Sequence, residues 1–396
     1  MGTTPAYPHD LFTDAVLAQP HEHFRAMRDL GPVVWLEAHE MYAIPRYEEA
    51  RAALIDAQTF CSGQGVALND VMNGISAGRS TLMTDGEVHD HLRRVLARNI
   101  TPRALSSLND QVEVLAADLV RQLVNRGSFD AVFDLSRALP LKVVPDLVGW
   151  PTDGRDRLLE WAGATFELFG PMNERASRAM PQAQAMFAFA DETAANGGLR
   201  PGSVGAGVID AAQRGELEPD RVAPLLVGYL VPSLDTTISA IGSAVWLLAT
   251  HPDQWEALQA DASLVPNAFN ETLRLESPIR AFSRVTTTET RVGDADIPAG
   301  ARVAVFYAAA NRDERRFDRP DDFDITRSNA GEHLGFGLGT HSCAGQGLAR
   351  MEAHAVLRAF VDQVESLELN DEPTRALNNV INAWACLPVT VQSRSR

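Results

Sequence analysis

One cysteine stands in a glycine-rich loop, HLGFGLGTHSCAGQG, which runs from His333 to Gly347. A cysteine can serve as a disulfide partner, a metal ligand or a structural residue, and its surroundings decide which. The other two cysteines, Cys61 and Cys386, are far from Cys343 in the chain and give neither a disulfide framework nor a zinc pair. A dinucleotide-binding fingerprint also fails, because its third glycine is missing. A buried structural cysteine and a thiolate ligand to iron remain.

The glycines favour the iron ligand. Gly337, Gly339 and Gly345 keep the loop thin enough for a flat porphyrin to lie against it. The segment AGQGLARMEAHAVLRAF then predicts a helix, whose N-terminal dipole would favour the negative charge of a thiolate. A thiolate bound to haem pushes electron density onto the iron and favours cleavage of the O–O bond. The loop therefore predicts a haem-thiolate site with Cys343 as the ligand.

Most of the remaining sequence predicts helices that could position such a site. Apolar residues recur at helical spacing over residues 114–127 and 89–102, and a longer apolar segment extends from about residue 220 to 250. Strand patterns are few, over residues 32–46 and, as two or three short hairpin strands, over 284–311. The pattern predicts a mainly α fold with a minor sheet.

The segment FGLGTHSCAG, from Phe336 to Gly345, resembles the F-G-x-G-x-H-x-C-x-G haem loop of the cytochrome P450 family without a gap. This resemblance covers nearly the whole chain. It implies a cytochrome P450 fold, mainly α with small β-sheets, and haem b (iron protoporphyrin IX) between a long oxygen-binding helix and the helix after Cys343. Phe336, Gly337 and Gly345 would contact the haem. We expect a single domain over residues 1–396, with a β-rich part at about 30–60, a helical body at about 85–280 and the haem-thiolate loop at 335–347.

Two further motifs occur in the order that the family implies. The segment ETLR resembles the E-x-x-R helix, so Glu271 and Arg274 would lock the core on the cysteine side, joined by Arg319 or Arg327. The segment LDTT resembles the acid–alcohol pair of the oxygen-binding helix. There Asp235 would relay protons and Thr236 would hold the oxygen for protonation.

The chain departs from the family just before LDTT, where Pro232 and Ser233 replace the usual Ala-Gly. A proline inside a helix removes one backbone hydrogen bond and costs about 3 kcal/mol or more. Two outcomes are open. Pro232 either fixes a kink that the oxygen site needs, or it displaces Thr236 and weakens the coupling of oxygen activation to product formation.

Four residues match family positions that bind the haem propionates. His89 and Arg93 lie in DGEVHDHLRR, Arg284 lies in AFSRVTT, and His341 lies in the cysteine loop. The implied reaction consumes O2 and two electrons, inserts one oxygen atom into a C–H bond and reduces the other to water. The resemblance implies an iron-sulfur ferredoxin and an NAD(P)H-dependent ferredoxin reductase as the electron source.

Charge and composition limit which other partners the protein can have. The net charge of −17 argues against nucleic-acid binding. Arg94, Arg98 and Arg350 are candidates for a basic face that an acidic ferredoxin would approach. The apolar stretch from Val222 to Ala249 is interrupted by polar residues, so we expect no membrane span, and the start of the chain lacks a signal-peptide pattern. We expect a cytoplasmic protein.

Aromatic and apolar residues are predicted to line a pocket for a small flat substrate. The candidates are Phe166, Phe169, Leu234, Phe282 and Trp384. Several stretches are similar to bacterial P450s that demethylate para-substituted benzoates, in which an Arg-Ser pair on the oxygen-binding helix helps to hold the carboxylate. This chain has Val227 and Gly228 there.

The loss of that pair favours a neutral methoxyarene or phenolic ether, although Arg79 and Ser80 could still bind an acid. We therefore expect oxidative O-demethylation of a small aromatic ether. Two alternatives stay open: a hydroxylase of a larger terpene or polyketide, and a haem-thiolate ligand sensor that is not an enzyme.

Overall fold

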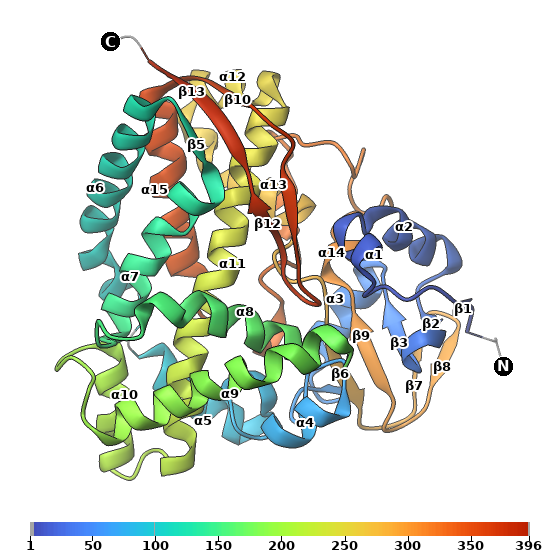
Figure 1. Ribbon diagram of the computed structural model, residues 1–396. Helices are drawn as coiled ribbons and strands as arrows, with labels where there is room; N and C mark the ends of the chain where they lie inside the picture. Colours follow the sequence, from blue (N-terminus) through green and yellow to red (C-terminus); the bar gives the residue numbers. More distant parts are fainter. Residues whose placement is uncertain (1–3, 99, 395–396) are drawn as a thin grey trace.

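The computed structural model describes residues 4–98 and 100–394. Helices form most of the body, and small sheets lie at two of its edges (Figure 1). The mainly α prediction is therefore confirmed. The helices are α1 Asp14–Ala18, α2 His21–Leu30, α3 Tyr47–Ile55, α4 Asp70–Ser76, α5 Gly86–Ala97, α6 Pro102–Arg126, α7 Ala138–Val148, α8 Leu158–Phe169, α9 Glu174–Ala195, α10 Val204–Gln213, α11 Val222–Thr250, α12 Pro252–Ala260, α13 Val265–Leu275, α14 Tyr307–Ala310 and α15 Gln346–Gln363.

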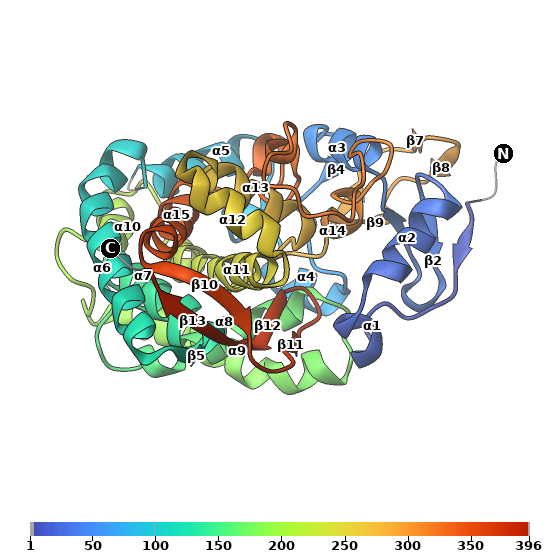
Figure 2. The ribbon, with the colours of Figure 1, turned by 90° about the horizontal axis from the view of Figure 1, so that it is seen from above.

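Helix α11 is the central element, and other helices surround it in both views (Figures 1 and 2). It passes through the body beside α7, α8, α9, α13 and α15. Most of its side chains are buried, as expected for a helix that is apolar around much of its circumference. Helix α15, which follows the cysteine loop, packs against α6 and α11, so the loop is held against the middle of the molecule.

The residues of α11 also meet the length and hydropathy needed to cross a membrane, contrary to the expectation from its polar interruptions. In the structure, 72% of the apolar 18-residue stretch of this helix is buried inside the protein. Its apolar surface is covered by neighbouring helices, so α11 is a core helix of this fold.

The largest sheet joins segments from both ends of the sequence, in the order β1-β2-β3-β9-β6-β4. Strand β3 pairs in parallel with β9, which brings the N-terminal part against the segment after residue 300, as the neighbouring blue and orange ribbons show (Figure 1). These strands are β1 Ala6–Tyr7, β2 Val34–Leu36, β3 Met41–Ile44, β4 Phe60–Cys61, β6 Phe282–Thr286 and β9 Arg302–Val305.

The C-terminal part forms strands that the sequence analysis did not predict. Strand β13 pairs with both β10 and β5, and β11 pairs with β12 in a hairpin. Strands β7 and β8 form a separate hairpin, so residues 284–311 contribute four strands with β6 and β9 instead of two or three. The remaining strands are β5 Ser128–Asp130, β7 Thr290–Val292, β8 Ala295–Ile297, β10 Val364–Leu369, β11 Thr374–Leu377, β12 Asn382–Cys386 and β13 Pro388–Ser393.

Candidate active site

The cysteine loop holds the sulfur of Cys343 at the N-terminus of α15. The backbone N–H of Cys343 donates to the carbonyl of Phe336 at 2.7 Å, which closes the loop. Burial raises the pKa of the Cys343 thiol, whereas the backbone N–H groups of Gly345 and Gln346 act to lower it. These donors favour the thiolate, because a charge-assisted hydrogen bond is stronger than one to a neutral thiol.

Two glycines of the loop have different roles. Gly337 has a φ of 65° and lines the cavity above the loop. Gly339 has a φ of 68°, and a side chain there would place its Cβ 2.7 Å from the carbonyl oxygen of Leu54, at the end of α3. Gly339 is therefore needed for packing against α3. The expectation that it makes room for a porphyrin is corrected, since it is not among the cavity-lining residues.

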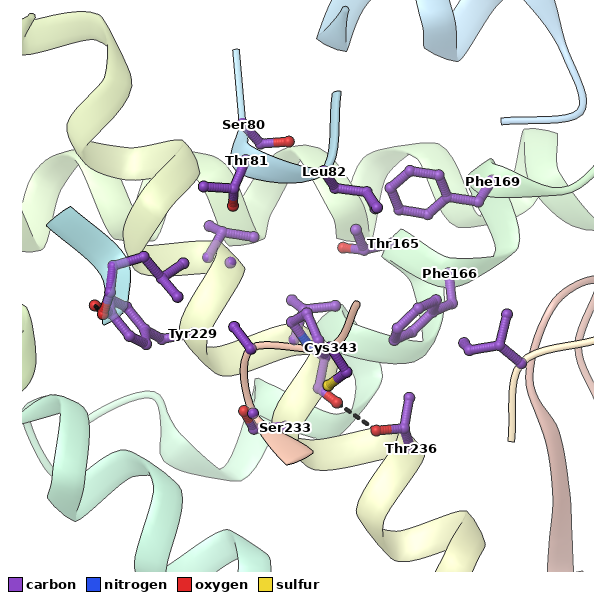
Figure 3. Close-up of a pocket in the computed structure, with 18 of the residues that line it drawn as sticks. Ser80, Thr81, Leu82, Thr165, Phe166, Phe169, Tyr229, Ser233, Thr236 and Cys343 are labelled. Carbon is purple, nitrogen blue, oxygen red and sulfur yellow. Dashed lines mark hydrogen bonds between the residues drawn. The ribbon is translucent and has the colours of Figure 1, made fainter. Parts of the chain in front are cut away.

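A cavity of about 580 Å³ extends from the cysteine loop along α11. Figure 3 shows its edges, with Cys343 and Thr236 on one side, Phe166 and Phe169 on another, and the Ser80–Leu82 turn opposite. Phe282 also lines it, and its ring meets that of Phe169 edge-on at 5.6 Å. Three of the predicted pocket aromatics therefore share one wall.

Basic side chains gather beside the cysteine loop. Arg93, Arg284 and His341 line the cavity. Arg93 donates to the carbonyl of Ser342 at 2.8 Å, and His341 contacts Asp85 at 3.3 Å. His89 lies directly behind, with its ring 4.5 Å from that of His341. The structure thus brings together all four residues that were predicted to bind propionates, although His89 does not itself line the cavity.

These residues fit a haem group. The Nε2 atom of His89 is buried and has no hydrogen-bond partner among the described residues, which is a costly arrangement unless a bound group supplies one. Two guanidinium groups and the His341 ring supply further donors on the same side as the cysteine. One cysteine with amide donors to its sulfur, cations for two carboxylates and an apolar cavity form the donor set that a haem with a thiolate ligand requires.

Helix α11 remains unbroken through Pro232. The hydroxyl of Thr236 donates to the Pro232 carbonyl at 2.6 Å, drawn as the dashed line in Figure 3. Thr236 and Ser233 line the cavity, so Pro232 does not remove the predicted alcohol from it. Ser233 lies near the loop: a Cβ on Gly345 would be 3.9 Å from its hydroxyl oxygen.

Asp235 turns away from the cavity and toward α8. Within the part of the chain that the structure describes, its Oδ2 atom has no hydrogen-bond partner, and a Cβ on Gly163 of α8 would be 3.6 Å from it. Burial raises the pKa of Asp235 to about 7, opposed by the positive charge of Arg137. A carboxyl with this pKa can hold and release a proton near neutral pH.

Two predicted pocket residues lie elsewhere. Leu234 is fully buried in the core and does not line the cavity, although Ser233 and Thr236 next to it on α11 do. Trp384 belongs to β12, where its ring packs against Trp246 and under the guanidinium of Arg375, 3.5 Å from the ring centroid. Both predictions are corrected.

The E-x-x-R pair forms a buried network. Arg274 donates to both carboxylate oxygens of Glu271, each at 2.8 Å, and neither side chain is exposed. Arg327 donates to Glu271 at 2.8 Å as well, which identifies the third arginine. Arg319 is exposed and contacts only surface carboxylates among the described residues.

The three arginines of the predicted basic face differ in how available their charges are to a partner protein. Arg94 is exposed, Arg98 is ion-paired with Glu216 at 2.5 Å, and Arg350 lies over the ring of Phe336 at 5.0 Å. The Arg350 guanidinium also donates to Asn270 at 2.6 Å. Arg350 therefore supports the cysteine loop from behind, and its charge is only partly available to a partner.

The far end of the cavity has a polar edge that the sequence only partly revealed. Arg79 and Ser80 line it as predicted, and Thr165, Gln184 and Asp191 add polar groups from α8 and α9. No sequence pattern marked these last three, because they are single polar residues on helices whose orientation depends on packing.

Comparison with known proteins agrees with this site. Residues 208–381 match the family model described as cytochrome P450. The chain is 38% identical to "Cytochrome p450 CYP199A2" of Rhodopseudomonas palustris, over 98% of this chain and 96% of that protein. The fold is similar to cytochrome P450 CYP109Q5 from Chondromyces apiculatus (TM-score 0.83, 28% identity, 98% of this chain and 99% of that chain).

A second similar structure is cytochrome P450 CREJ in complex with (4-ethylphenyl) dihydrogen phosphate (TM-score 0.85, 25% identity, 95% of this chain and 98% of that chain). The 38% identity to CYP199A2 over nearly the full length of both chains decides the family, and the cysteine loop, the buried E-x-x-R pair and the long central helix agree with it. The chain belongs to the cytochrome P450 family, whose members are haem-thiolate monooxygenases.

Proposed function

We propose that this monooxygenase removes the methyl group of a small aromatic ether by oxidation of its methyl C–H bond. The balance is one methoxyarene, O2, two electrons and two protons giving a phenol, formaldehyde and water. The observation that supports it most is the wall formed by Phe166, Phe169 and Phe282, which line the same cavity as Cys343. Edge-on aromatic walls favour a flat aromatic ligand.

The roles of the site residues follow from their positions. Cys343 would bind the haem iron through its sulfur, and His89, Arg93, Arg284 and His341 would hold the propionates. Haem b with a thiolate ligand supplies the redox chemistry that activates O2. The protein contributes a largely apolar cavity, whose walls would fix the orientation of the substrate.

Proton delivery would begin at Asp235 and end at the hydroxyl of Thr236. The Asp235 carboxyl is adjacent in sequence to Thr236 but faces α8, so it can take a proton from that side. Thr236 faces the cavity, and its donation to the Pro232 carbonyl orients its hydroxyl. This arrangement separates the side of proton uptake from the side of the reaction.

Electrons would come from a ferredoxin and its NAD(P)H-dependent reductase. Arg94 is the exposed cation on α5, whose other arginine, Arg93, lines the cavity beside Cys343. An acidic ferredoxin that binds at Arg94 would therefore lie near Cys343, so electrons would have a short distance to travel.

A neutral or weakly acidic ether is favoured over a benzoate by the residues on α11. Val227 and Gly228 line the cavity without any charge, whereas Arg79 and Ser80 lie at its far end. The CREJ complex contains an aryl phosphate, a para-substituted aromatic anion, so a role of Arg79 in binding an anion is the second candidate. That candidate would make 4-methoxybenzoate the better ligand.

Titration of the Soret band with 4-methoxyphenol and with 4-methoxybenzoate separates these possibilities. We expect the phenol to shift the band toward the high-spin form and to yield formaldehyde with NADH, ferredoxin and reductase. A strong shift by the acid alone, lost in Arg79→Ala, would support the benzoate. No shift by either compound would contradict the aromatic ether and favour a larger substrate.

A further inference from the structure

Pro232 removes one donor from the backbone hydrogen bonds of α11. In an α-helix the N–H of residue 232 would donate to the carbonyl of residue 228. Proline has no N–H, and its ring presses on that carbonyl. Because α11 continues from Val222 to Thr250 through this position, the Gly228 carbonyl lacks its helical donor in the middle of the helix.

This carbonyl lies at the wall of the cavity. Gly228 and Pro232 are four residues apart, hence on one face of α11, and both line the cavity. A Cβ on Gly228 would meet no atom within 4 Å, so there is open space beside its backbone. Among the described residues, no side chain donates to the Gly228 carbonyl.

The neighbours of this acceptor along α11 that line the cavity are apolar. Pro224, Val227 and Val231 line the cavity from the same helix. An acceptor without a partner in such a place is costly, and a hydrogen bond made there is stronger than in water. A carbonyl accepts hydrogen bonds and repels a carboxylate, so it selects a ligand that carries a donor.

We propose that the Gly228 carbonyl is the subsite that binds the hydroxyl of a phenolic substrate, which makes the preferred substrates methoxyphenols. This inference rests on the proposed O-demethylation and adds to it the group by which the substrate is recognised. The phenol O–H donates to the Gly228 carbonyl while the ring packs against the cavity wall. Arg79 is not required for this recognition.

The test compares two ligands that differ in the donor alone, 4-methoxyphenol and 1,4-dimethoxybenzene. Dissociation constants are measured by calorimetry on the haem-loaded protein, with the Soret shift as a second readout. We expect the wild type to bind the phenol about three- to tenfold more tightly, the ratio that one hydrogen bond gives. The dimethyl ether is more apolar, so the hydrophobic effect alone would favour the opposite order.

Pro232→Ala restores the backbone N–H at position 232, which then donates to the Gly228 carbonyl as in a regular helix. We expect this variant to lose the preference, so that the dissociation constants of the two ligands are nearly equal. Pro181→Ala is the matched control, because Pro181 also lies inside a helix, α9, but does not line the cavity. It should keep the wild-type ratio.

The proposed subsite would be contradicted if the wild type bound the two ligands with equal dissociation constants. It would also be contradicted if Pro232→Ala kept the wild-type ratio of these constants. If both ligands bind equally and both release formaldehyde, the subsite is wrong and the demethylation stands; if neither binds, the demethylation fails too. Should Pro232→Ala not retain haem, Pro232→Leu gives the second test. Leucine also restores the backbone N–H at position 232 and keeps an apolar side chain there, so a preference that survives this substitution also contradicts the proposal.

Discussion

Arg274 and Glu271 are joined by two parallel hydrogen bonds, each 2.8 Å long, in a place that water does not reach. The pair is one helical turn apart on α13, and the same guanidinium donates to the carbonyls of Asn311, Pro320 and Asp322. It therefore connects α13 to the segment that leads into the cysteine loop. Removal of one partner would leave a buried charge without compensation.

We expect Arg274→Ala to lower the free energy of unfolding by about 3–5 kcal/mol, the range for breaking a buried ion pair. Urea denaturation followed by circular dichroism measures this change, and haem retention should fall with it. Arg319→Ala is the control in the same region. Its contacts are exposed, so a change within about 1 kcal/mol is expected. A fall in the free energy of unfolding as large in Arg319→Ala would show that the effect is not specific to the buried ion pair.

Cys343→Ser should abolish monooxygenase activity, since serine supplies no thiolate. The absorption spectrum of the reduced, carbon-monoxide-bound protein should lose the red-shifted Soret band that a thiolate ligand produces. Cys386→Ser is the matched variant. That cysteine lies on β12, away from the cavity, and the spectrum should not change. Retention of the thiolate spectrum in Cys343→Ser would exclude Cys343 as the ligand.

Asp235→Asn should lower the turnover number by about 100-fold or more, the usual range for loss of a proton-transfer group. The raised pKa of about 7 means that the wild-type carboxyl loses its proton as pH rises through neutrality. The rate of product formation in the wild type should therefore fall above about pH 7, and the variant should lack this dependence.

The measurement for Asp235 is the rate of formaldehyde release per enzyme molecule, from pH 6 to pH 9, in steps of roughly half a unit. Thr250→Ala, at the exposed end of α11, is the control for a mild change in the same helix. A wild-type profile that is flat across this range would contradict the role of Asp235 in proton delivery.

Glu352 on α15 is buried, and neither of its carboxylate oxygens has a hydrogen-bond partner in residues 4–98 and 100–394. Burial raises its pKa from 4.5 to about 8. Between these two values the unfolded chain loses its proton while the folded protein keeps it, so stability falls as pH rises through this window.

Glu352→Gln should remove that fall and stabilise the protein by roughly 1–3 kcal/mol at about pH 9, with little effect near pH 4.5. Thermal unfolding of both proteins across this pH range measures the difference. Asp362→Asn, an exposed acid on the same helix, should leave the pH dependence unchanged. A variant that is less stable than the wild type at high pH would show that Glu352 has a charged partner.

Local sequence determined the parts of the site that depend on neighbours along the chain. The glycine pattern and the helix after Cys343 define the loop, and the spacing of Glu271 and Arg274 defines the pair on α13. The long apolar segment at about residues 220–250 predicted α11, because a long apolar helix needs no distant partner to be recognised.

Only the tertiary structure decided which residues meet across distant elements. It selected Arg327 over Arg319 for the Glu271 network, and it assigned Gly339 to packing against α3. It placed Leu234 and Trp384 outside the cavity. Each of these outcomes depends on the rotation of a helix or the pairing of a strand, which packing sets and local sequence does not. The strands of the C-terminal part were missed for the same reason, since β13 gains its partners from residues far away in the chain.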